Sequence, residues 1–188
     1  MPAKSRPQIM TQGKSRRQKI VMPGKSRQQK IYLADKLKNE LAQIPFYPLT
    51  VVVSPSGFGK TTAVREYFKE CLPDDARLYW YTCLSENSSA EWAGICDLFT
   101  DINSETAKNL KELEFLTPES LIHISAYLKD LRINKETYIV IDNFQLLKSD
   151  ILQDLINVMS MHGNPHLHII IITQNFGIKK QFTFHNAS

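Results

Sequence analysis

A glycine-bearing loop followed by a lysine and two threonines is the part of the sequence best suited to chemistry. Residues 54–62 read Ser-Pro-Ser-Gly-Phe-Gly-Lys-Thr-Thr and follow a run of three valines. Glycines let backbone N–H groups approach an anion closely, and the start of a helix adds partial positive charge. The pattern is that of a phosphate-binding loop (P-loop), G-x-x-x-x-G-K-[ST], with Ser54 in place of the first glycine. An ordinary strand-to-helix turn is the alternative.

This pattern predicts which residues contact a nucleotide. Lys60 is expected to reach the terminal phosphates, Thr61 to ligate Mg²⁺ through its hydroxyl, and Thr62 to lie near the α-phosphate. The predicted nucleotide-contacting residues of the loop are Ser54, Pro55, Ser56, Gly57, Phe58, Gly59, Lys60, Thr61 and Thr62.

A P-loop needs an acid from a neighbouring strand to hold Mg²⁺. Asp142 ends the apolar run Tyr-Ile-Val-Ile and is the predicted metal ligand, together with Thr61. Many ATPases carry a second acid next to it, but here Asn143 can orient a water without accepting its proton. Lys60, Asp142 and Asn143 are thus the predicted catalytic residues, and hydrolysis is expected to be slow or regulated. Glu86 is a possible substitute base, although a solvated loop acid is the more common role for such a residue.

The elements that must position these residues alternate between strands and helices. Strands are predicted at 49–53, 78–83, 138–142 and 167–173, and the last two are continuously apolar. Such runs are typical of a parallel sheet covered on both faces, so we predict a three-layer α/β P-loop NTPase. The last strand is expected between the P-loop strand and the Asp142 strand, with an incomplete C-terminal edge. Gln174 then lies beside the γ-phosphate as a sensor.

Apolar spacing of three and four residues predicts the helices. We expect one from 31 to 44, one from the P-loop to about 71, one opened by a capping box of Ser88 and Glu91, and one from 117 to about 131. Another is expected at 149–161. The polar segment 101–116 is ambiguous and is predicted as a loose helix.

Composition divides the chain into two parts. The 188 residues include 43% hydrophobic and 22% charged residues, which is typical of a globular protein. Residues 1–30 hold nine of the 23 Lys and Arg and no acid. We predict a basic, extended or disordered arm at 1–30, able to contact nucleic acid, and a P-loop NTPase domain, possibly truncated, at 31–188.

Targeting and cysteine patterns bear on the compartment. The sequence has no apolar run of the roughly 18–20 residues needed to span a membrane and no secretory signal, so no membrane association is predicted. Three cysteines without C-x-x-C spacing indicate reduced core thiols in a cytoplasmic protein.

Beyond the P-loop, Trp80-Tyr81-Thr82, Ile139-Val140-Ile141-Asp142-Asn143 and the strand 168–174 also match a known family. Over about residues 25–178 the chain resembles the ATPase module of the STAND class, as found in large ATP-dependent LuxR-type transcription regulators of the maltose-regulon-activator type. The resemblance implies an ATP/ADP switch with Mg²⁺, DNA-binding domains elsewhere, and nucleotide-dependent self-association. That family commonly has an acid at Asn143 and an arginine at Gln174, so discrimination between ATP and ADP is expected to be weaker here.

Three functions remain open at this point. The first is an ATP-binding switch module of a transcription regulator. The second is a catalytic P-loop ATPase or small kinase, against which stand the missing second acid and the lack of an arginine-rich lid segment. The third is a nucleic-acid-binding protein that uses the basic arm and has a vestigial P-loop. ATP turnover and the salt dependence of DNA binding distinguish them.

Overall fold

A four-stranded parallel sheet forms the centre of the molecule. The computed structural model describes residues 33–113, 117–147 and 152–174; the predicted basic arm and the predicted C-terminal edge lie outside these ranges. The strand order is β1-β4-β3-β2, which confirms the predicted position of the last strand. The strands are β1 Leu49–Val53, β2 Arg77–Thr82, β3 Thr137–Asp142 and β4 Leu167–Thr173.

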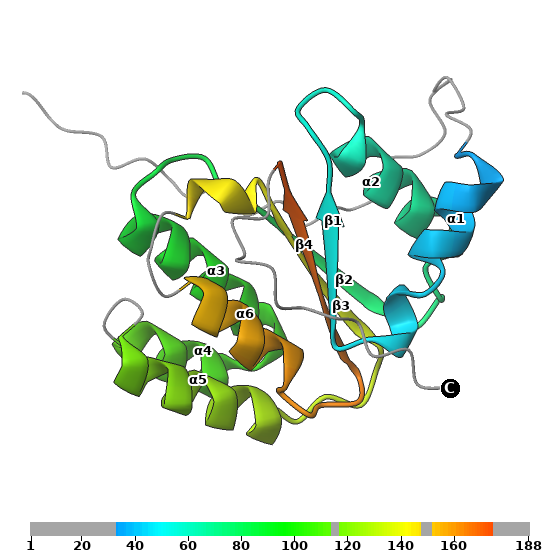
Figure 1. The fold of residues 1–188 in the computed structure, drawn as a ribbon. Helices are drawn as coiled ribbons and strands as arrows, with labels where there is room; N and C mark the ends of the chain where they lie inside the picture. The colour runs from blue at the N-terminus through cyan, green and yellow to red at the C-terminus, as the bar shows by residue number, and fades with distance from the viewer. Residues whose placement is uncertain (1–32, 114–116, 148–151, 175–188) are drawn as a thin grey trace, which may run out of the picture.

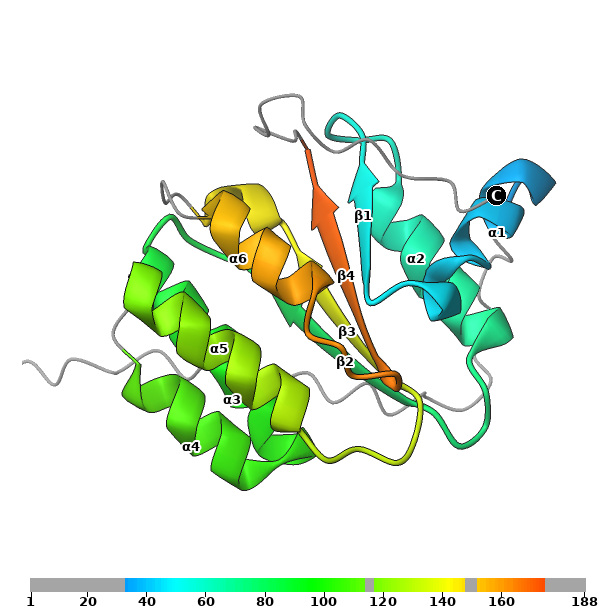
Figure 2. The ribbon, with the colours of Figure 1, turned by 60° about the horizontal axis from the view of Figure 1, so that its bottom comes forward.

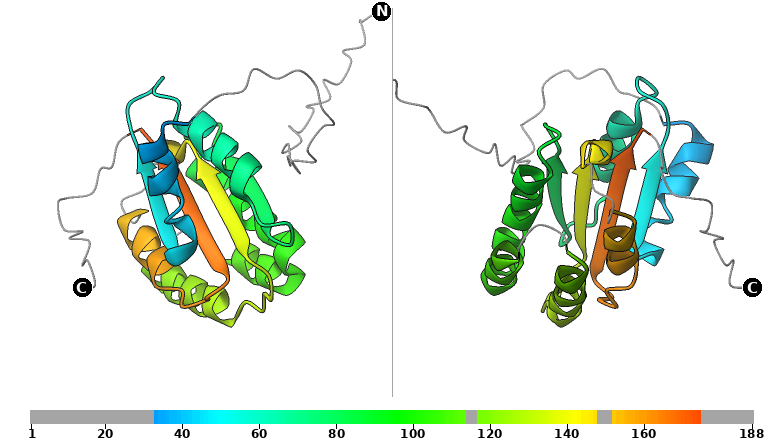
Figure 3. Two further views of the ribbon diagram at one scale, coloured as in Figure 1. Left: turned by 90° about the vertical axis from the view of Figure 1, so that its right-hand side faces the viewer. Right: turned by 60° about the vertical axis from the view of Figure 1, so that its left-hand side comes forward.

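Burial on both faces explains why the two central strands are continuously apolar. Every residue of β3 and β4 is buried, whereas β1 and β2 are largely half-buried. The right panel of Figure 3 shows the four strands side by side, from green β2 through β3 and β4 to cyan β1. Because all pairs are parallel, the four carboxyl ends meet at one edge of the sheet, where Thr82 registers with Asp142 and Val53 with Thr173.

One face of the sheet is covered by the first two α-helices, α1 Asp35–Leu41 and α2 Lys60–Cys71, which flank β1 (Figure 1). Between α1 and β1 lies a short 3₁₀ helix, η1 Ile44–Phe46. The core on this side joins residues of α1, η1 and α2 to side chains of β2, β3 and β4: Leu41, Ile44, Ala63, Val64, Tyr67, Phe68, Trp80, Tyr138, Val140, Ile170 and Ile172. The predicted apolar stripe of the P-loop helix is therefore confirmed, apart from Cys71, which is exposed.

Four helices cover the opposite face (Figure 2). They are α3 Ser88–Ile102, α4 Ser104–Glu112, α5 Pro118–Asp130 and α6 Leu152–Ser160. Their inward residues form the larger core with the alternate side chains of β3 and β4, including Ile139, Ile141, Ile169 and Ile171. Two packed helical layers around one sheet give the three-layer α/β fold predicted from the sequence. None of the helices in the described ranges is long and apolar enough to cross a bilayer.

Several helix boundaries differ from the prediction. The Ser88–Glu91 capping box is wrong: Asn87 is the N-cap of α3, and its side chain accepts from the N–H of Ala90. The ambiguous segment 101–116 contains a regular helix, α4, because Asn103 both ends α3 and caps the next helix by accepting from the N–H of Thr106. The first predicted helix is shorter than expected: α1 ends at Leu41, and the 3₁₀ helix η1, which contains Pro45, follows it.

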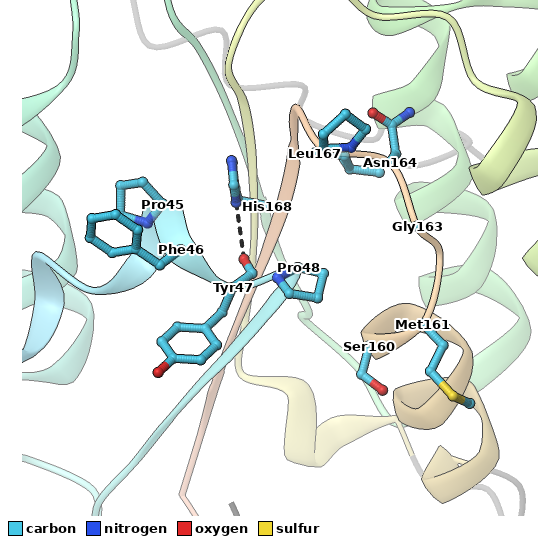
Figure 4. Close-up of a pocket in the computed structure, with 11 residues that line it drawn as sticks. Pro45, Phe46, Tyr47, Pro48, Ser160, Met161, Gly163, Asn164, Leu167 and His168 are labelled. Atoms are coloured by element: carbon cyan, nitrogen blue, oxygen red, sulfur yellow. Dashed lines mark hydrogen bonds between the residues drawn. The ribbon is translucent and has the colours of Figure 1, made fainter. Parts of the chain in front are cut away.

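Polar groups tie the amino edge of the sheet together. Glu136 bridges two histidines, with 2.8 Å from Oε1 to Nδ1 of His166 and 2.8 Å from Oε2 to Nε2 of His168. The other nitrogen of His168 lies 2.9 Å from the carbonyl oxygen of Tyr47, the contact drawn in Figure 4. Burial alone would raise the pKa of Glu136, but the hydrogen bonds to the two histidines outweigh it and lower the pKa overall.

A groove of about 360 Å³ opens at this same edge, between the η1–β1 link and the turn that leads into β4. Phe46 and Met161, which line it, are 74% and 71% exposed. The groove lies at the end of the sheet opposite the P-loop, so it forms no part of the predicted nucleotide site.

Candidate nucleotide site

The P-loop joins the carboxyl end of β1 to the start of α2. Gly57 and Gly59 have φ angles of 83° and 74°, in the left-handed region that side chains disfavour, which accounts for both glycines. Ser54 has no positive φ, so the residue that departs from the glycine pattern stands where glycine's conformational freedom is not needed. Phe58, between the two glycines, points outward and is 75% exposed.

The first turn of α2 presents backbone donors and a lysine at this loop. Gly59 is the N-cap and has no side chain to cap the first N–H groups of the helix, which suits them to an anion. Nζ of Lys60 donates to the carbonyl oxygens of Ser54 at 2.5 Å and Pro55 at 2.9 Å. The ammonium group is therefore held at the loop, within the segment that the sequence assigns to phosphates.

The next residue links the P-loop to the acid at the end of β3. Thr61 Oγ1 donates to Oδ1 of Asp142 at 3.1 Å, across 81 residues of sequence. The same carboxylate oxygen accepts from the backbone N–H of Asn143 at 2.9 Å, and Asp142 is only 4% exposed. A hydroxyl and a carboxylate thus meet at the carboxyl edge of the sheet, and both are oxygen donors of the kind that Mg²⁺ prefers.

Asn143 and Gln174 are both adjacent to the short helix that follows β3, η2 Phe144–Leu146: Asn143 is its N-cap, and Gln174 is hydrogen-bonded to it. Asn143 is half-buried and has a φ of 56°, a conformation that asparagine tolerates better than most residues. The N–H of Gln174 donates to Oε1 of Gln145 at 3.2 Å, so the tip of β4 is tied to η2. Gln174 itself is exposed at the carboxyl edge, the edge at which the sequence places it.

The loop after β2 completes this edge. Cys83 donates its backbone N–H to the carbonyl oxygen of Asp142 at 2.9 Å, so the loop starts beside the acid. Burial, together with the negative charges of Glu91 and Asp142, raises the pKa of the Cys83 thiol to about 12. A thiol that keeps its proton is a core group, as predicted for Cys83 and also found for buried Cys96.

Two residues near this edge were not predicted. Gln145 has no motif around it, and its contact with the tip of β4 depends on strand order. The sequence predicts a capping role for Glu91, yet this residue is only 4% exposed and its carboxylate accepts hydrogen bonds from Tyr81 and Ser85. An acid within an otherwise apolar helix face beside Trp92 and Ile95 is the one sequence signal that could have indicated it.

A parallel sheet with this strand order, a glycine-bearing loop that leads into a helix, and an acid on the next strand but one define a P-loop nucleoside triphosphatase fold. The family model described as "AAA domain" matches residues 47–182, and the chain belongs to this family. The match covers all four strands together with the P-loop and Asp142.

Among characterised proteins, the chain is similar to transcriptional regulators. It is 26% identical over 147 residues to the HTH-type transcriptional regulator MalT of Yersinia pestis (strain Pestoides F), covering 74% of this chain and 16% of that protein. The MalT of Vibrio parahaemolyticus is 21% identical over 140 residues, 71% of this chain and 15% of that protein. The chain thus spans about a sixth of the length of these relatives.

Proposed function

We propose that this chain is an ATP-binding switch module of a signal-transducing transcription regulator, with slow or regulated hydrolysis. The observation that carries the proposal is the 3.1 Å contact between Thr61 and Asp142, which joins the P-loop helix to the acid-bearing strand. A switch of this kind binds ATP and ADP with different consequences because only ATP carries a γ-phosphate. The similarity to MalT supports the regulatory setting.

Thr61 and Asp142 are the residues proposed to hold Mg²⁺, which when bound would neutralise phosphate charge. In the described ranges no group of three or more His, Cys, Asp or Glu could hold a metal ion. That suits Mg²⁺, which is usually held by one or two protein ligands together with substrate phosphates and waters. Lys60 and the N–H groups of the loop bind the phosphates, and Gln174 reports the γ-phosphate.

Asn143 favours a switch over a fast catalyst. An amide next to Asp142 can orient a water but cannot take its proton at neutral pH. Part of the proposal is therefore that turnover stays below about 1 s⁻¹, at the low end of ordinary enzymes. Nucleotide-dependent self-association, and nucleic-acid binding by residues 1–30 or by other domains, belong to the same proposal.

Calorimetric titration with ATP and with ADP, each with Mg²⁺, tests the proposal. Lys60→Ala should weaken ATP binding by about tenfold to a hundredfold, because a hydrogen bond to a charged group contributes about 1.5–3 kcal/mol. Lys69→Ala is the matched control, since Lys69 lies in the same helix and pairs with Glu66 at 3.1 Å. Absence of binding by the wild type, or equal binding by Lys60→Ala, would contradict the proposal.

A further inference from the structure

We infer that Glu91 is a positioning residue that fixes the loop after β2 so that Glu86 supplies the carboxylate lacking at Asn143. This inference rests on the proposed function, because it concerns hydrolysis of the nucleotide bound there. It changes the role of Glu86 from a solvated loop acid to the proton acceptor of a slow ATPase.

The loop that carries Glu86 is anchored on both sides of that residue. Before it, the Ser85 N–H and hydroxyl donate to Oε1 of Glu91 at 2.9 and 2.8 Å. After it, the N–H of Asn87 donates to the hydroxyl of Ser85 at 3.3 Å, and the Asn87 side chain caps α3. The backbone at Glu86 is thereby held between two fixed neighbours while its side chain is exposed.

The anchor itself is a buried carboxylate with specific partners. Oε2 of Glu91 accepts from the hydroxyl of Tyr81 at 2.7 Å. The three donors to this carboxylate, the Tyr81 hydroxyl and the N–H and hydroxyl of Ser85, are all neutral groups. Burial and the neighbouring Glu91 raise the pKa of Tyr81, which keeps its hydroxyl a donor. A buried carboxylate is costly unless such bonds satisfy it, and here the bonds fix the loop.

The position of the loop connects it to the candidate site. Its first residue, Cys83, is hydrogen-bonded to the backbone of Asp142, and β2 ends in register with that acid. Glu86 is therefore three residues beyond a point fixed at the carboxyl edge, one strand away from the predicted metal ligand. Asn143, which follows Asp142, cannot accept a proton there.

The chemical step assigned to Glu86 is simple. A water oxygen forms a bond to the γ-phosphorus, and the bond from that phosphorus to the β–γ bridging oxygen breaks. The proton of the water passes to the Glu86 carboxylate, and the products are ADP and inorganic phosphate. General-base catalysis of this kind contributes about 10²- to 10⁴-fold.

Single-turnover hydrolysis and ATP affinity, measured separately on the full chain, test the inference. Glu86→Gln should lower the hydrolysis rate by about 10²-fold with the ATP Kd unchanged, whereas Glu105→Gln, an exposed acid of α4, should change neither. Glu91→Ala should lower the rate by about tenfold or more, because misplacement by about 1 Å can cost about 10²-fold. Glu91→Gln, which keeps an acceptor oxygen, should retain more of the rate.

Tyr81→Phe and Tyr79→Phe form a matched pair. Both tyrosines lie on β2 and donate to α3, but Tyr79 bonds to the carbonyl of Asp101 at 3.3 Å and does not contact Glu91. Only Tyr81→Phe should slow hydrolysis. The inference is overturned if Glu86→Gln hydrolyses ATP at the wild-type rate, if the Glu91 variants lose affinity and rate in parallel, or if the wild type binds ATP without hydrolysing it. Failure of the wild type to bind ATP would instead refute the proposed function, and the inference with it.

Discussion

Replacing Gly94 by alanine is expected to destabilise the protein even though alanine is the better helix former. Gly94 is a buried residue of α3, and Tyr81 packs directly against it. A methyl group at this position would overlap with Oη, Cε2 and Cζ of Tyr81, well inside the ordinary contact distance of about 3.5–4.0 Å. The ring cannot simply move away, because its hydroxyl is bonded to Glu91.

The magnitude follows from three opposing contributions. The helix gains up to about 1 kcal/mol from replacing glycine by alanine. Overpacking costs about 1–3 kcal/mol, and loss of the hydrogen bond to the carboxylate costs about 1.5–3 kcal/mol. The net loss is therefore about 1.5–5 kcal/mol of unfolding free energy, which lowers Tm by at least about 3 °C in a chain of this size.

Urea and thermal unfolding measure this effect. Ala93→Gly is the control, since Ala93 is the exposed neighbour of Gly94 and its replacement should cost only about 1 kcal/mol. In the Tyr81→Phe background the cost of Gly94→Ala should be smaller, because the hydrogen bond has already been removed. A Gly94→Ala protein as stable as the wild type, or more stable, would refute the packing argument.

Three further predictions concern stability. Burial lowers the pKa of His162, so the unfolded chain binds more protons than the folded one below about pH 6.5, and the free energy of unfolding should decrease as pH falls from there. The pKa of Glu136 is also lowered, so the loss of stability should continue as pH falls below 4.5, the ordinary pKa of this carboxyl group; urea titrations from pH 8 to 3 measure both effects, and a flat profile would contradict them. Thr117→Ala should cost about 1 kcal/mol, because its hydroxyl accepts the N–H of Ser120 at 3.1 Å at the start of α5; Thr117→Asn should restore most of it in thermal melts. Asn143→Val should cost about 1–2 kcal/mol at a φ of 56° while Asn143→Gly is nearly neutral, and equal Tm values for the two would argue against strain at this position.

Much of the fold could be predicted because its signals are local. The continuous apolar runs of β3 and β4 indicate strands buried on both faces, and the chain order of P-loop and acid then indicates which strand lies between them. The contact between Thr61 and Asp142 follows from those two facts, since carboxyl ends of parallel strands share an edge.

The sequence predictions failed where two local patterns compete for the same helix end, or where a residue distant in sequence determines the packing. Asn87 and Ser88 can both cap a helix; the cap forms at Asn87, and Glu91 accepts from Tyr81 and Ser85 instead of completing a capping box. Nothing in the sequence around Gly94 indicates that a ring from β2 will pack against it. The break between α3 and α4 is likewise set by the side chain of Asn103, in a segment too polar to show a clear period.

β4 lies between β1, which leads into the P-loop, and β3, which ends in Asp142, so a substitution in β4 can affect the candidate site from a distance. Ile171 of β4 stands in register with Val51 on one side and with Ile141 on the other, and it is fully buried. β1 and β3 each pair with β4 and not with one another. The spacing between the strand that leads into the P-loop and the strand that ends in Asp142 is therefore set by β4. The Ile171 side chain packs in the core beneath α3 to α6, so a change of its volume would disturb the packing of those helices on β4 and, through the strand, the geometry at its carboxyl end, without removing any group at the candidate site.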